Sequence, residues 1–155
     1  MAAMSNKLEN SFIDWFFRAQ AIGITGASAA AGTGPTSLYV ALYTSAPTAA
    51  GGGTEVSGGS YARVAVSSSL ANWAGTQGAG TTTASTGTSG ATSNNAAITF
   101  PAPTANWGVI VSFAILDATT SGNFLFYGAL TTSKTVNNGD AAPSFAAGAL
   151  SITFS

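Results

Sequence analysis

The stretch WGVIVSFAILD, residues 107–117, decides the fold of this 155-residue chain. It is the longest apolar run in the sequence, and its valines and isoleucines are β-branched residues that favour strands. A continuous apolar run bounded by turn residues is typical of a strand in the interior of a sheet. We therefore interpret residues 107–117 as a central strand.

Short strands and turns follow this run toward the C-terminus. The sequence ATTSG, residues 118–122, predicts a tight hairpin-like turn, and NFLFYGALT, residues 123–131, predicts the strand after it. KTV, residues 134–136, precedes Asn-Asn-Gly, a strong turn signal because Asn and Gly tolerate positive φ. GALSITFS, residues 148–155, is expected to be the closing strand.

Segments with strand periodicity also precede the central run. SLYVALYT, residues 37–44, and SYARVAVSS, residues 60–68, alternate between two sets of side chains, as strands do. NNAAITF, residues 94–100, ends at Pro101, which stops ladder pairing. Several short strands separated by turns predict an all-β fold, a β-sandwich or jelly roll. We expect a single domain over residues 1–155, with the sandwich over 37–155.

One helix is predicted, over residues 5–20, and a connection over 21–36 joins it to the first strand. Asn6 and Glu9 have the spacing of a capping box. An apolar stripe at helical spacing comprises Leu8, Phe12, Trp15, Phe16 and Ala19, and Ile13 and Phe17 widen it. The stripe packs either on the sheet of the same chain or on another subunit. For the second alternative, Phe12, Trp15 and Phe16 are the candidate anchors, since aromatic residues are enriched at interfaces.

Residues 74–93 form a segment of low complexity, made almost wholly of Gly, Ala, Ser and Thr. Such small residues bury little apolar surface and form no core of their own. We expect a flexible, exposed loop that contains one short edge strand. Two thin edge strands rich in Thr are the alternative.

Charged residues make up 6% of the chain, and the formal net charge is -1. A surface this neutral repels other copies weakly, which favours association into a homo-oligomer. The four bases are scattered along the sequence, whereas binding of nucleic acid needs clustered Lys or Arg. Asp14 and Arg18 interrupt the most apolar early run, so no membrane span is expected.

The chain has no Cys and no His, which removes the residues of most metal sites and the usual general base near neutral pH. We expect no metal, no cofactor and no catalytic residue. Glycoside hydrolysis would need two carboxylates across a cleft, for which Glu55, Asp117 and Asp140 are the candidates. Each of them lies beside turn residues, where acids usually accept backbone N–H bonds. The sequence therefore favours a protein that is not an enzyme.

Glu55 and Arg63 are eight residues apart in GGGTEVSGGSYARVAV, residues 51–66, within a chain that otherwise avoids charge. We predict a bidentate contact between the guanidinium and the carboxylate, which would fix a glycine-rich loop over the sheet edge. The same pair would also orient an interface with a partner. Both residues are therefore interface candidates.

Aromatic rings also suggest a sugar-binding platform, because their faces stack on the apolar faces of ligands. Trp107 opens the central strand and is expected to be in the core. Trp73 precedes the segment of low complexity and is the more plausible exposed ring, which makes it a further interface candidate.

The order of several motifs resembles a family of small structural proteins of tailed bacteriophages, often labelled tail fibre proteins. The motifs are SLYVALYTSAPT, GGGTEVSGGSYARV, NNAAITFPAPTANWG, ILDATTSGNFLFYGAL and NNGDAAPSFAAGALSITF. The resemblance covers residues 6–155 and implies a virion component without enzymatic activity, assembled in the cytoplasm of a bacterial host.

Between the roles that this resemblance leaves open, we favour capsid decoration. A short chain without long repeats or heptads is typical of a cement protein that bridges major capsid protein subunits, and fibres usually show such repeats. Cement would stabilise the head lattice by binding only its assembled state. The alternative is a tail fibre, baseplate or tail-adaptor component that contacts tail proteins and a receptor or carbohydrate.

Overall fold

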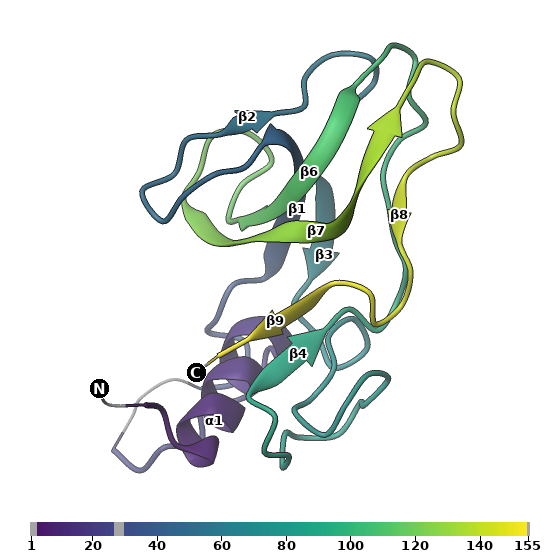
Figure 1. Ribbon diagram of the computed structural model, residues 1–155. Helices are drawn as coiled ribbons and strands as arrows, with labels where there is room; N and C mark the ends of the chain where they lie inside the picture. Colours follow the sequence, from purple (N-terminus) through teal and green to yellow (C-terminus); the bar gives the residue numbers. More distant parts are fainter. Residues whose placement is uncertain (1–2, 27–29, 155) are drawn as a thin grey trace. The chain divides into compact units, whose positions relative to one another are not determined.

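The structure, a computed structural model, describes residues 3–26 and 30–154 (Figure 1). Within these ranges, most of the regular structure is antiparallel strands, and a single α-helix lies near the N-terminus. The predicted all-β class with one N-terminal helix is therefore confirmed. The sandwich or jelly-roll arrangement stays a prediction.

The chain forms two compact units. The first unit comprises Met1–Ser37, Ser67–Ile98 and Phe145–Ser155, and the second comprises Leu38–Val66 and Thr99–Ser144. Each unit is thus assembled from segments that are far apart in the sequence. The single domain over residues 1–155 stays a prediction.

A five-stranded antiparallel sheet organises the second unit. Its strands are β1 (Ser37–Ser45), β2 (Thr54–Glu55), β3 (Val64–Ser67), β6 (Gly108–Leu116) and β7 (Phe124–Val136). The order is β2-β1-β6-β7, and β3 also pairs with β1. The apolar run that was predicted to be central forms β6, which lies between β1 and β7. Ala114 of β6 lies opposite Ala41 of β1, and Ser112 of β6 lies opposite Ala129 of β7. Ala41 and Ala114 are fully buried.

The edge strand β7 joins two segments that the sequence separated. Residues 123–131 and 134–136 were predicted as two strands, whereas one strand runs from Phe124 to Val136. Its register with β6 shifts between the Ile110–Lys134 and Ser112–Ala129 pairs. Between these two pairs β7 has more residues than β6, and the ladder accommodates them as an irregularity. Thr131, Thr132 and Ser133 therefore do not end the strand.

The first unit combines helix α1 (Asn6–Arg18) with β4 (Ala91–Ser93) and β9 (Ser151–Thr153), which pair antiparallel. Ser5 is the N-cap, and its Oγ accepts a hydrogen bond from the Leu8 N–H, so the cap lies one residue before the predicted Asn6. Ala19 ends the helix in the left-handed conformation, with φ 54°. This helix is not long and apolar enough to cross a membrane, and it is the one helix of the described residues.

Three predicted strands are shorter than expected. The segments 60–68, 94–100 and 148–155 contain only β3, β5 (Ile98–Thr99) and β9, and β5 pairs with β8 (Ser144–Phe145). Before β5, fully buried Asn94 forms an isolated antiparallel bridge with Trp73, and its side chain adds further hydrogen bonds to neighbouring backbone groups. Its Nδ2 donates to the carbonyl oxygens of Ala96 and Ala146, and its Oδ1 accepts from the Leu150 N–H.

Candidate functional site

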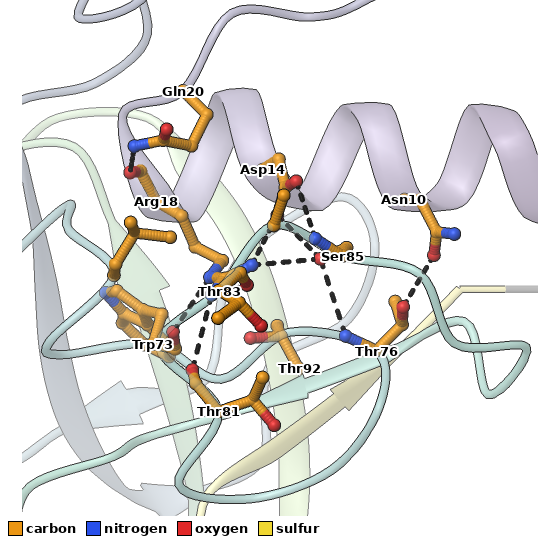
Figure 2. Close-up of polar contacts among 12 residues, drawn as sticks. Asn10, Asp14, Arg18, Gln20, Trp73, Thr76, Thr81, Thr83, Ser85 and Thr92 are labelled. Carbon is orange, nitrogen blue, oxygen red and sulfur yellow. Dashed lines mark hydrogen bonds and ion pairs between the residues drawn. The ribbon is translucent and has the colours of Figure 1, made fainter.

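Arg18, at the end of α1, is the centre of a buried polar network in the first unit (Figure 2). The residue is 0% exposed, and hydrogen bonds use all five of its N–H groups. Nε donates to the carbonyl oxygen of Trp73 at 3.0 Å, and Nη2 donates to those of Thr81 and Thr83 at 3.3 and 2.6 Å. The side chain thus fixes the loop that follows Trp73.

Asp14 neutralises this arginine from the preceding turn of α1. Arg18 Nη1 forms an ion pair with Asp14 Oδ1 and also donates to Ser85 Oγ at 3.1 Å. The Asp14 carboxylate in turn accepts from the Ser85 N–H at 2.8 Å and from its hydroxyl at 2.6 Å. Because both charges are paired and hydrogen-bonded, their burial is tolerated.

The same helix face holds the rest of the segment of low complexity. Asn10 Oδ1 accepts from Thr76 Oγ1 at 2.6 Å, and Asn10 Nδ2 donates to the Gly87 carbonyl at 3.2 Å. Only glycine fits at position 87, since a Cβ there would lie 2.2 Å from the Thr76 carbonyl oxygen. Residues 74–90 contain no strand and β4 follows them, and side chains from α1 hold their backbone. The flexible, exposed loop over residues 74–93 stays a prediction.

Helix α1 therefore buries a polar face together with Ile13 and Phe17, which are both 0% exposed. The predicted apolar stripe lies largely outside this contact. Leu8 is 39% exposed, and Phe12, Trp15 and Phe16 are half-buried. Phe12 stacks on Phe16 with ring centroids 5.3 Å apart and meets Phe154 edge-on at the same distance.

Trp73 is fully buried, so its prediction as an exposed ring was wrong. It packs against Phe17 with ring centroids 5.0 Å apart. The residues that follow it are small, which suggested exposure, but the buried Arg18 covers this part of the first unit. Within the described ranges, Trp73 Nε1 has no hydrogen-bond partner. No sugar platform can form on this ring.

The second unit contains its own arginine-centred network, around Arg63. Nε and Nη2 donate to Glu55 Oε1 and Oε2, both at 2.8 Å, in the predicted bidentate contact. Nη1 donates to the carbonyl oxygens of Ala118 and Ser121, also at 2.8 Å, in the turn between β6 and β7. Arg63 thus links the glycine-rich loop to that turn. The interface role of Glu55 and Arg63 stays a prediction.

Tyr61 completes this second network. Its hydroxyl donates to Glu55 Oε1 at 3.0 Å and accepts from the Leu42 N–H of β1 at 2.9 Å. Burial of the ring raises the pKa of Tyr61, and the Glu55 hydrogen bond raises the pKa of Arg63. Tyr61 and Arg63 therefore both keep their protons across the neutral range.

The remaining candidate carboxylates stabilise turns. Asp117 accepts from the side-chain amide and the backbone N–H of Asn123, both at 2.6 Å, and these bonds lower the pKa of Asp117. Asp140 accepts from the Asn137 N–H at 2.7 Å. In the part of the chain that the structure describes, no three His, Cys, Asp or Glu residues gather as metal ligands would.

The sequence indicated the second network and missed the first. Asp14 and Arg18 were interpreted only as an interruption of an apolar run. The available signal was their i,i+4 spacing, which places opposite charges on one helix face in a chain with few charges.

These features define a small, mostly β structural protein whose ion pairs fix its own loops. A family model described as podophage GP4 fiber I protein gp80 matches residues 3–153. Because the match spans nearly the whole chain, this chain belongs to that family. No curated protein matches it. The family is one of phage fibre proteins, so the chain is a structural component of the virion and interacts with other phage structural proteins.

The match confirms the resemblance to phage structural proteins but gives no support to capsid decoration. The predicted tail-fibre alternative fits the family description better than cement. The absence of heptads and long repeats, which favoured cement, was a weak criterion because it tests only for extended fibre shafts.

Proposed function

We propose that the protein is a non-enzymatic building block of a phage tail fibre. The observation that carries this proposal is the match of residues 3–153 to a fibre family. Its contribution is mechanical and adhesive: folded units present fixed loops and contact neighbouring virion proteins.

The state of the carboxylates supports a role without catalysis. Asp14 and Glu55 are paired with arginines, and Asp117 and Asp140 accept backbone N–H groups. A general acid or a nucleophile needs a carboxylate that is available to a substrate. These four are already engaged in holding loops.

Assembly into the virion is proposed to use the half-exposed face of α1, namely Leu8, Phe12, Trp15 and Phe16. Aromatic residues are favoured anchors of protein interfaces, and the low charge of the chain lowers the cost of covering its surface. The occupant that we propose is a second copy of this chain, because a surface with so little charge repels other copies weakly.

A charge placed on this face should block assembly and spare the fold. Leu8→Lys would bury an unpaired ammonium in the contact, so we expect about tenfold fewer copies per particle, the equivalent of roughly 1.4 kcal/mol. The measurement is quantitative mass spectrometry of purified particles from a phage that carries the variant. Asn6→Lys adds the same charge to the exposed start of the helix and is the matched control. Equal incorporation of the two variants would contradict the proposed contact.

Particles that lack the protein distinguish a fibre from cement. We expect heads with normal resistance to heat and osmotic shock but particles that no longer adsorb to cells. Adsorption and DNA retention are measured on the same preparation, and labelling with an antibody locates the protein. Labelling over the whole head, with loss of DNA in its absence, would overturn the fibre proposal.

A further inference from the structure

We propose that the second unit carries a binding pocket for a neutral saccharide, between the loop at residues 57–63 and the turn at residues 119–121. The inference deepens the proposed fibre function and rests on it for its biological meaning. The binding itself is a property of the folded chain and is testable without the virion.

The pocket has a volume of about 540 Å³, within the range of small-molecule sites. Glu55, Tyr61 and Arg63 lie on one side, and Thr119, Thr120 and Ser121 lie on the other. Nε and Nη2 of Arg63 donate hydrogen bonds to the Glu55 carboxylate. Nη1 of Arg63 donates to the carbonyl oxygens of Ala118 and Ser121. One side chain therefore holds both walls, and the pocket is formed before a ligand arrives.

Left-handed serines occur in the loop and in the turn that form the pocket. Ser60 has φ 62° and Ser121, which lines the pocket, has φ 54°. Among the described residues, the third non-glycine residue with positive φ is Ala19, which is the helix C-cap. Strained residues persist where the surroundings over-determine them, and they concentrate at binding sites. Here the hydrogen bond from Arg63 to the Ser121 carbonyl supplies such a constraint.

The charge of the pocket selects a neutral ligand. Glu55 cancels Arg63, and the guanidinium already makes four hydrogen bonds to protein oxygens. An anion would have to displace Glu55, and the ionised Asp117 lies close enough to Arg63 for their charges to interact. A cation would find a carboxylate that is already neutralised.

The groups left for a ligand suit the hydroxyls of a sugar. Within the described part of the chain, no hydrogen bond engages the side-chain hydroxyls of Ser57, Thr119, Thr120 or Ser121. A hydroxyl both donates and accepts, so these groups match an array of sugar hydroxyls. Arg63 Nη2 retains one N–H and Glu55 Oε2 accepts only one bond, which adds a donor and an acceptor side by side. Tyr61 adds an aromatic ring to the wall.

The test is a titration of the full chain with neutral hexoses, 6-deoxyhexoses and N-acetylhexosamines, followed by backbone amide shifts in NMR spectra. We expect at least one of these sugars to bind with a Kd on the order of 1 mM. Shifts should be confined to residues around 55–63 and 117–123. Ser57→Tyr fills the pocket mouth and should weaken binding at least about tenfold. Thr132→Tyr places the same side chain at an exposed position of β7 and should leave binding unchanged.

Three results would overturn the inference. The first is that no neutral sugar changes any backbone amide shift. The second is that a uronic acid binds more strongly than its neutral parent sugar, and the third is that the Ser57→Tyr and Thr132→Tyr proteins bind sugar equally well at equal thermal stability. A protein located in the fibre that binds no sugar leaves the proposed function intact. A protein that binds sugar but covers the head refutes the proposed function and not the pocket.

Discussion

Replacing Arg18 with methionine is expected to lower the free energy of unfolding of the first unit by roughly 3–5 kcal/mol, the usual cost of removing one partner of a buried ion pair. The substitution leaves the Asp14 carboxylate without its counter-charge and frees the carbonyl oxygens that Arg18 holds. Urea denaturation followed by far-ultraviolet circular dichroism measures the loss. Hydrogen exchange should show the largest increase in residues 74–90.

Two further variants make this prediction specific. Lys7→Met removes an exposed positive charge from the same helix and should change stability by no more than about 0.5 kcal/mol. Replacing Asp14 and Arg18 together with leucine and methionine should cost less than the sum of the two single changes, because neither charge is then left unpaired. A loss below about 1 kcal/mol for Arg18→Met would show that the loop does not depend on this network.

Trp73→Ala is expected to cost roughly 3–5 kcal/mol, as truncation of a buried aromatic residue does. The ring is 0% exposed and packs on Phe17, so its removal leaves a cavity against the helix. Thermal unfolding followed by circular dichroism measures the change. Trp15→Ala, at a half-buried ring of the same unit, should cost clearly less.

Trp73→Phe separates the two roles of this residue. It keeps most of the packing and removes the indole N–H, which has no partner among the described residues. A buried polar group without a partner costs about 1–3 kcal/mol, so its removal should offset much of the lost volume. Trp73→Phe is thus expected to retain most of the stability that Trp73→Ala loses. Equal losses for the two substitutions would mean that the indole N–H contributes a hydrogen bond.

Sequence patterns predicted the strands whose burial is continuous. The apolar run at 107–117 and the segment 37–44 became β6 and β1, because buried strands need apolar residues throughout. Residues 60–63 alternate as well, but the positive φ angles at 58–60 delay the strand until Val64. Periodicity reports which side chains alternate and not whether the backbone reaches a ladder partner.

The candidate site was predictable where its two charges lie close in sequence. Glu55 and Arg63 are near each other along the chain, and few other charges compete for them. The partners of Arg18 could not be predicted, because most are backbone carbonyls of a distant loop and a carbonyl has no signature in the sequence. Helical spacing likewise identified an apolar stripe but not the face of the helix that is buried. That face contains Asp14 and Arg18, whose charges can be buried because each neutralises the other.

Arg18 fixes the loop through the backbone carbonyl groups of Thr81 and Thr83 and not through their side chains. Every amino acid carries the same carbonyl oxygen, so a substitution at position 83 changes what the loop displays and keeps the acceptor that fixes it. The side chains at positions 82–84 are exposed. This part of the molecule therefore combines a backbone position that Arg18 fixes with exposed side chains whose identity those hydrogen bonds do not constrain.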